Sequence, residues 1–197
     1  ASDVYKRQQK KMKNNQKGAT MLEAIATISV VTVLAIASIR LIGNLFDMFK
    51  QNTVANEIRE IQKNITSRFA LEGNYETLKG DAEYLQKERL VPNQMIANKK
   101  IYHRLGGKVT IATDSTNNLH YQVTFDSLNN RGCLNLAQIN WVINQGTDLV
   151  AIQVNAKKFE QPVGNLTAGE NTLPLTMEKA AKVCNNKNDN TITWTFQ

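Results

Sequence analysis

The sequence is poor in the residues that build metal centres and thiol chemistry. Its 197 residues include two cysteines and two histidines, and these four residues lie far apart with no paired-ligand spacing. A zinc site of that kind needs four Cys or His ligands, so we expect neither a metal centre nor a cofactor. Ten glycines and three prolines are also few, which excludes collagen-like and low-complexity chains. With 42% hydrophobic and 21% charged residues, the chain is expected to form one folded domain with an appendage.

Net positive charge is concentrated in the amino-terminal segment. The net charge is +7, and residues 1–18 carry +5 of it because they contain six basic residues and one acidic residue. The rest of the chain has no basic run beyond Lys99-Lys100 and Lys157-Lys158. Binding through phosphate neutralisation requires a clustered basic face, so we expect no direct nucleic-acid partner.

Sequence motifs of familiar enzyme classes are missing. There is no Gly-x-Ser-x-Gly elbow and no His-Glu-x-x-His motif, and Gly107-Lys108 lacks the preceding glycine and the following Ser or Thr of a P-loop. His120 falls on the polar face of a predicted strand and has no identifiable nucleophile to serve. We interpret His120 and His103 as ordinary exposed residues, and the chain as not an enzyme.

A long apolar run follows the basic segment. From Ala19 to Ile42 the chain has 24 residues, of which only Glu23 and Arg40 are charged. A bilayer core of ~30 Å needs roughly 20 helical residues, so this segment is long enough to span a membrane. The basic residues before it predict that the amino-terminal side is cytoplasmic and that everything after Gly43 is extracytoplasmic.

The helix is expected to continue past the apolar run, which argues against a cleaved secretory signal peptide. The next apolar residues recur at spacings of three and four, the period of a helix with one buried stripe: Val54, Ile58, Ile61, Ile65 and Phe69. Gly73-Asn74 is a stop signal. If Gly43 only bends it, residues 19–71 form one helix of ~80 Å.

The remainder, residues 73–197, predicts an α+β head. Helices are expected over 81–89, over 133–142, and over Met177–Cys184 with Thr176 as a cap. Strands are expected over 108–113, 119–126, 149–155 and 191–196, with a polar loop over 156–175. The last strand is predicted to close the sheet.

Alternating residues in two of these strands predict the core. In the strand over 119–126 the inward residues are expected to be Leu119, Tyr121, Val123 and Phe125. In the strand over 191–196 they are expected to be Ile192, Trp194 and Phe196. The helix that Cys133 opens is expected to turn inward Leu134, Ala137, Trp141 and also Ile143. We interpret Trp141 and Trp194 as core residues rather than a ligand platform.

The residues around Gly18 resemble a type IV prepilin leader. They read Lys17-Gly18-Ala19-Thr20-Met21-Leu22-Glu23, with further basic residues before them. In that family a membrane peptidase cuts after the glycine on the cytoplasmic side and N-methylates the new first residue. The resemblance implies removal of residues 1–18, methylation of Ala19, and Glu23 as the acidic residue at mature position five. One departure is Ala19, which replaces the large apolar residue common at the first mature position.

Glu23 is the unusual residue of the apolar run. A carboxylate in such a helix costs about 2.5 to 3.5 kcal/mol on insertion scales. In a fibre, Glu23 is expected to pair with the amine of Ala19 on a neighbouring subunit, which neutralises both charges. The alternative is that Glu23 lies at the headgroup level and has no partner.

The two cysteines of an extracytoplasmic head are expected to pair. That compartment permits disulfides, and no third cysteine competes with Cys133 and Cys184. The alternative is two free thiols.

Later landmarks extend the resemblance to type IVb pilins, nearest to the subunits of thin conjugative and enteric adherence pili. In order they are Gly73-Asn74-Tyr75, Leu90-Val91-Pro92-Asn93-Gln94-Met95, Gly106-Gly107-Lys108-Val109, Cys133 with Leu136, and Cys184 with the terminal strand. The resemblance implies a type IV pilin fold with a leader over 1–18, a helix over 19–72 whose part 19–43 mediates membrane insertion and assembly, and a head over 73–197. It also implies a role in adhesion or conjugation-related contact.

The implied partners are other copies of the chain in a helical filament, a prepilin peptidase, an assembly ATPase and an inner-membrane platform. The implied locations are the bacterial inner membrane and then the extracellular pilus. A minor pilin or a secretion pseudopilin is the alternative within this class. A membrane-anchored extracytoplasmic binding or sensor domain, in which Gly18 is never cut, is the alternative from another class.

Overall fold

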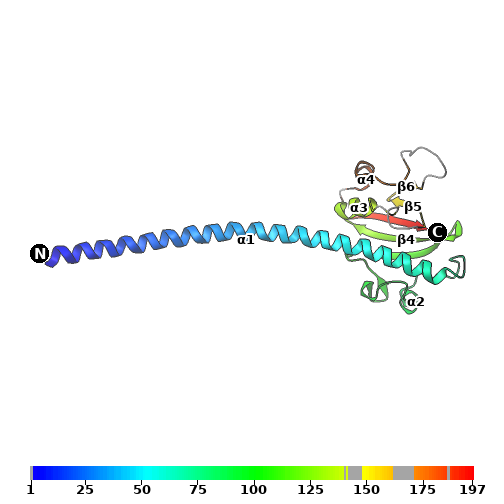
Figure 1. The fold of residues 1–197 in the computed structure, drawn as a ribbon, viewed down its shortest axis with the longest axis horizontal. Helices are drawn as coiled ribbons and strands as arrows, with labels where there is room; N and C mark the ends of the chain where they lie inside the picture. The colour runs from blue at the N-terminus through cyan, green and yellow to red at the C-terminus, as the bar shows by residue number, and fades with distance from the viewer. Residues whose placement is uncertain (1, 140, 142–147, 162–170, 186) are drawn as a thin grey trace. The chain divides into compact units, whose positions relative to one another are not determined.

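The structure is a computed structural model that describes residues 2–139, 141, 148–161, 171–185 and 187–197. Of residues 2–20, 39–48 and 51 it describes the backbone alone. It divides into two compact units, Ala1–Met48 and Phe49–Gln197. One helix, α1 (Ser2–Phe69), begins in the first unit and ends in the second (Figure 1). The helix predicted over 19–71 is therefore present, and it also includes the basic segment before Ala19.

The carboxyl-terminal third of α1 belongs to the core of the second unit. All five residues of the predicted stripe are buried: Val54, Ile58, Ile61, Ile65 and Phe69. The helix ends at Phe69, whose carbonyl accepts a hydrogen bond from the N–H of Gly73 at 3.2 Å. Gly73 has a φ of +68°, a left-handed conformation that glycine adopts without steric cost. Gly73 therefore ends the helix, as the sequence predicted.

Five antiparallel strands form the main sheet in the order β3-β4-β7-β5-β6. Their bounds are β3 (Val109–Asp114), β4 (Asn117–Leu128), β5 (Leu149–Val154), β6 (Lys157–Glu160) and β7 (Asn190–Phe196). The last strand does not close the sheet as predicted, because β7 is central and pairs with both β4 and β5. Its inward residues Ile192, Trp194 and Phe196 are fully buried, as predicted.

Two strand predictions need correction. Leu119 is 46% exposed although Tyr121, Val123 and Phe125 are buried, because pairing of β4 with β7 begins only at Tyr121. The expected loop over 156–175 contains β6, which pairs with β5 across a turn where Asn155 has a φ of 52°. Residues 162–170 of that loop lie outside the described residues.

Short helices cover the rest of the head. They are α2 (Ala82–Lys87), the 3-10 helix η1 (Asn93–Met95), α3 (Asn130–Ala137) and α4 (Met177–Val183), and a small ladder joins β1 (Ile96–Ala97) to β2 (Lys100–Ile101). Thr176 caps α4 as predicted. The helix predicted from Cys133 begins earlier, because the side chain of Asn129 accepts a hydrogen bond from the Gly132 N–H at 2.7 Å and caps α3.

The core is aromatic at its centre. Trp194 packs edge-on against Phe125 with ring centroids 5.4 Å apart, and Trp141 lies 5.6 Å from Phe196. Both tryptophans are buried, as predicted, although Trp141 lies beyond the end of α3. Leu136 and Ala137 are buried on α3 while Leu134 is only half-buried, and the predicted inward residue Ile143 lies outside the described residues.

Candidate assembly site

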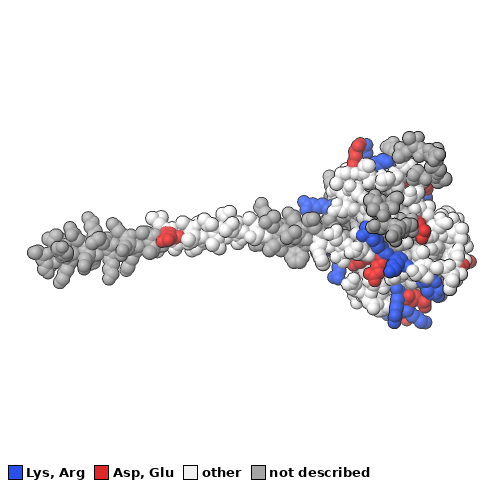
Figure 2. All heavy atoms as spheres, in the orientation of Figure 1, with Lys and Arg blue, Asp and Glu red and all other residues white. Residues whose placement is uncertain are grey.

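The amino-terminal unit contains an apolar helical stretch that nothing in its unit covers. Met21–Ser38 has a mean hydropathy of 2.0 and none of it is buried. In Figure 2 this part of α1 is almost free of charged side chains, whereas the head carries many of them. By length and composition this helix is able to cross a membrane.

Hydroxyl groups within this stretch are satisfied by the helix itself. Thr27, Ser29, Thr32 and Ser38 each donate a hydrogen bond to a carbonyl three or four residues earlier, at distances of 2.7 to 3.1 Å. A hydroxyl bonded in this way needs no water, which removes most of the cost of placing it in an apolar environment. The helix is therefore compatible with lipid, or with a packed apolar interface, despite its Ser and Thr content.

Glu23 is the ionisable residue of this stretch, and its side chain is exposed. Among the residues with described side chains, no basic group lies within ion-pair distance of it. Gly18 and Ala19, the expected cleavage and methylation positions, precede it on α1, with Ala19 about one helical turn away. The structure thus places these three positions together on one uninterrupted helix.

A disulfide joins Cys133 to Cys184, as predicted, with Cα atoms 5.9 Å apart. Cys133 lies in the first turns of α3, and Cys184 is the residue that ends α4. Both side chains are buried. The bond therefore links α3 to α4, the helices that precede and follow β5 and β6 in the sequence.

Asn190 is a buried polar residue beside this disulfide that the sequence did not single out. Its amide group donates to the carbonyls of Leu128, Asn185 and Lys187 at 3.0 to 3.2 Å. Its Oδ1 accepts hydrogen bonds from the Asn185 N–H at 2.8 Å and the Asn155 side chain at 3.0 Å. One side chain therefore holds the end of β4, the segment after Cys184 and the turn between β5 and β6.

Glu57 is buried in the stripe of α1, with 3% of its surface exposed. Its Oε2 accepts a hydrogen bond from the Arg104 N–H at 3.3 Å, and the Arg104 guanidinium lies 3.9 Å from Oε1. Burial raises the pKa of the Glu57 carboxyl above its usual value, although both Arg104 contacts act in the opposite direction. The sequence did contain a signal, because Glu57 lies three residues after Val54 and four before Ile61.

His103 is buried, which corrects its interpretation as an exposed residue. Its ring stacks on Phe125 with an interplanar angle of 2°, and its Nε2 lies 2.9 Å from the Asp126 carbonyl. Burial lowers the pKa of the imidazole, so the neutral form is favoured. His120, by contrast, is half-buried on β4.

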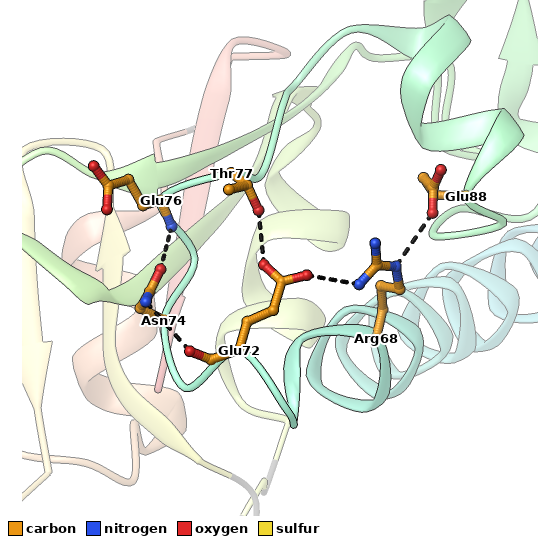
Figure 3. A network of polar contacts seen from close by, with 6 residues as sticks. All are labelled: Arg68, Glu72, Asn74, Glu76, Thr77 and Glu88. Atoms are coloured by element: carbon orange, nitrogen blue, oxygen red, sulfur yellow. Dashed lines mark hydrogen bonds and ion pairs between the residues drawn. The ribbon is translucent and has the colours of Figure 1, made fainter.

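A polar network surrounds the end of α1 (Figure 3). Arg68 donates to Glu72 at 2.7 Å and to Glu88 at 3.2 Å, and Thr77 donates to Glu72 at 2.8 Å. These hydrogen bonds, first that of Thr77 and then that of Arg68, lower the pKa of Glu72. The network links α1, the segment after it, and the end of α2.

No group of three or more His, Cys, Asp or Glu side chains suited to a metal ion occurs in the part of the chain that the structure describes. The features that distinguish the molecule are instead an apolar helix left unpacked by its own unit and a small, disulfide-bonded α+β head. This combination defines the class of type IV pilins.

The particular family follows from comparison with known proteins. The family model described as PilS N terminal matches residues 49–197, and the chain belongs to this family. The match confirms the resemblance to type IVb pilins that the sequence suggested. No curated protein matches the chain significantly.

Two solved structures are similar to the chain. One is TcpA, a type IV pilin from Vibrio cholerae El Tor biotype, with 15% identity, a TM-score of 0.47, and coverage of 75% of this chain and 99% of that chain. The other is the type IV b pilin from Salmonella typhi, with 14% identity, a TM-score of 0.48, and coverage of 71% and 96%.

Proposed function

We propose that this pilin is the structural subunit of a type IVb pilus, processed by a prepilin peptidase and assembled helically through its apolar helix. The observation that carries the proposal is the uncovered Met21–Ser38 helix with its single carboxylate. A stable exposed apolar surface of this length needs lipid or other protein around it. Storage in a bilayer followed by packing in a fibre provides both environments in turn.

In this proposal residues 1–18 are a leader removed by cleavage between Gly18 and Ala19, and Ala19 is then N-methylated. Residues 19–72 form the pilin helix, with 19–43 in the membrane before assembly, and residues 73–197 form the extracytoplasmic head. Cleavage on the cytoplasmic side leaves the helix attached to the head. The new amine of Ala19 carries a positive charge about one turn from Glu23.

Glu23 is proposed to pair with the Ala19 amine of a neighbouring subunit. An unpaired carboxylate in an apolar core costs several kcal/mol, and an ion pair with a good partner offsets much of that cost. The pairing would also fix the axial register of adjacent helices.

The proposed route begins in the bacterial inner membrane and ends in the extracellular pilus. The chain lacks a P-loop, so an assembly ATPase acting through an inner-membrane platform would supply the work. The assembled fibre is proposed to serve in adhesion or conjugation-related contact.

Three variants test the charge pairing. Glu23→Val and Glu23→Gln are expected to insert and to be cleaved normally but to yield few fibres, because neither can pair with the Ala19 amine. Thr27→Val, one turn further along, keeps the charge and removes a hydroxyl that already bonds within the helix, and it is expected to assemble normally.

Fibre yield is measured by shearing and electron microscopy in a host that carries a prepilin peptidase and an assembly machine. Normal fibres from Glu23→Gln would overturn the pairing role. An intact leader on the wild-type chain, with no fibres, would favour a membrane-anchored binding domain instead.

A further inference from the structure

An open groove lies at the carboxyl-terminal end of α1 in the head. Its volume is about 350 Å³, and it is lined by residues from the end of α1, the segment that follows, the start of β4 and the carboxyl terminus: Thr66, Phe69, Ala70, Gly73, Asn74, Tyr75, Leu119 and Gln197. The lining is mainly apolar, and Leu119 is 46% exposed within it. A cavity of ~150 Å³ is enough to hold benzene, so the groove is large enough for an aromatic side chain.

The second unit also carries an exposed aromatic side chain, at the start of its part of α1. Phe49, the first residue of the second unit, is 70% exposed. Phe49 and Phe69 both lie on α1, and their separation is about 30 Å at 1.5 Å per residue. The second unit therefore has an apolar projection and an apolar groove at opposite ends of its part of α1.

The described charges beside the two features are of opposite sign. Phe49 is followed by Lys50, which is exposed. The groove is bordered by exposed Glu76, next to Tyr75, and by exposed Asp148, whose carbonyl accepts a hydrogen bond from the Gln197 N–H at 2.7 Å. The carbonyl end of α1 adds partial negative charge to the same rim.

The nearby cation Arg68 does not reverse this sign, because it is already paired with Glu72 and Glu88 (Figure 3). The rim of the groove is therefore suited to a cationic neighbour of an aromatic residue. Phe49-Lys50 has that chemistry.

We propose that the groove receives Phe49 of a second copy of the chain, with Lys50 of that copy facing Glu76 and Asp148. The contact joins two different surfaces, and because it also displaces neighbouring copies along α1 it propagates as an open filament instead of closing into a ring. The inference rests on the proposed pilus function and specifies a head contact beyond the packing of the apolar helices. The contact would displace neighbouring copies by about 30 Å, which is the separation of Phe49 and the groove along α1.

Photocrosslinking in assembled fibres tests the contact. Phe49 is replaced by p-benzoylphenylalanine, the fibres are irradiated, and the cross-linked peptides are identified by mass spectrometry. Cross-links are expected to residues 66–75 or to the peptide that contains Leu119. The control places the same probe at Met177, which is 58% exposed on α4 and is expected to give no cross-link to the groove.

Fibre formation by substituted subunits provides a second readout. Loss of the buried ring in Phe49→Ser is expected to weaken the contact at least tenfold, whereas Phe49→Leu retains most of the apolar surface and assembles better. Fibres cross-linked from position 49 only to the apolar helices of other copies would overturn this inference and leave the pilus function standing. Absence of fibres from the wild-type chain would overturn the pilus function and this inference with it.

Discussion

Asn190 offers a sharp test of how the disulfide-bonded edge of the head is held. The change to Ala removes a fully buried amide that bonds to Leu128, Asn185 and Lys187 through its nitrogen and to Asn185 and Asn155 through its oxygen. The NH2 group has two protons, so three carbonyls share them and about four net hydrogen bonds are lost.

The expected cost can be estimated from what replaces these bonds. Asn185 and Lys187 are exposed, so their groups regain water, whereas the Leu128 and Asn155 groups are more enclosed. At about 1 kcal/mol for each of the four lost hydrogen bonds, with a further penalty for enclosed groups, Asn190→Ala should cost at least about 4 kcal/mol. For a domain of this size, about 4 kcal/mol lowers the melting temperature by roughly 8 to 16 °C.

Asn190→Asp should be worse than Asn190→Ala at neutral pH. The aspartate oxygen that replaces the amide nitrogen faces three carbonyl oxygens, so the charged form is disfavoured and the pKa of the new carboxyl is raised in the folded state. Its penalty should therefore shrink as the pH falls and the carboxyl takes up a proton.

The assay is thermal unfolding of the oxidised full-length protein in detergent, followed by fluorescence of the buried tryptophans. The matched control is Asn188→Ala, because Asn188 is exposed in the same segment. Wild-type stability of Asn190→Asp at neutral pH would refute the reasoning, as would an equal effect of Asn188→Ala.

Two further predictions concern the second unit, Phe49–Gln197. Replacing both Cys133 and Cys184 by Ala should cost about 4 kcal/mol, because the bond closes a loop with a sequence separation of 51, and protease resistance should become independent of reductant; unchanged resistance of the wild type with reductant would contradict this. Burial raises the pKa of Glu57, so the folded state holds a proton that the unfolded state has lost, and stability falls as pH rises through the window above the ordinary glutamate pKa. Glu57→Gln should lose this slope in urea titrations from about pH 4 to pH 8, and identical slopes would refute the effect.

Local patterns in the sequence predicted much of the fold. The stripe on α1, the cap of α4 by Thr176 and the buried face of β7 all follow from periodicity or from one capping residue. The disulfide followed from compartment and cysteine count. The helical stripe, the cap and the buried strand face depend on residues close together in the sequence. The disulfide depends on there being only two cysteines. Both kinds of information are present in a single sequence.

What failed depends on contacts between distant segments. The central position of β7 is set by its pairing with both β4 and β5, which strand periodicity does not encode. Strand β6 has only Phe159 buried, so its polar sequence resembled a loop. His103 was misread because its burial comes from stacking on Phe125 of β4, far along the chain.

Buried polar groups were the hardest part of the candidate site to foresee. Glu57 falls in the helical register of the stripe, but a glutamate among isoleucines is usually assigned to the solvent side. Asn190 lies in an asparagine-rich segment that looks like an ordinary turn, and its importance appears only when Leu128 and Asn155 are brought to it.

The most direct test of the pilin account is the intact mass of the full chain expressed with a prepilin peptidase and, in parallel, without it. The account predicts that residues 1–18 are lost only when the peptidase is present, and that the new amino terminus at Ala19 carries one added methyl group. The same mass should be found for the subunit in sheared fibres. A leader that remains intact under both conditions would contradict the account.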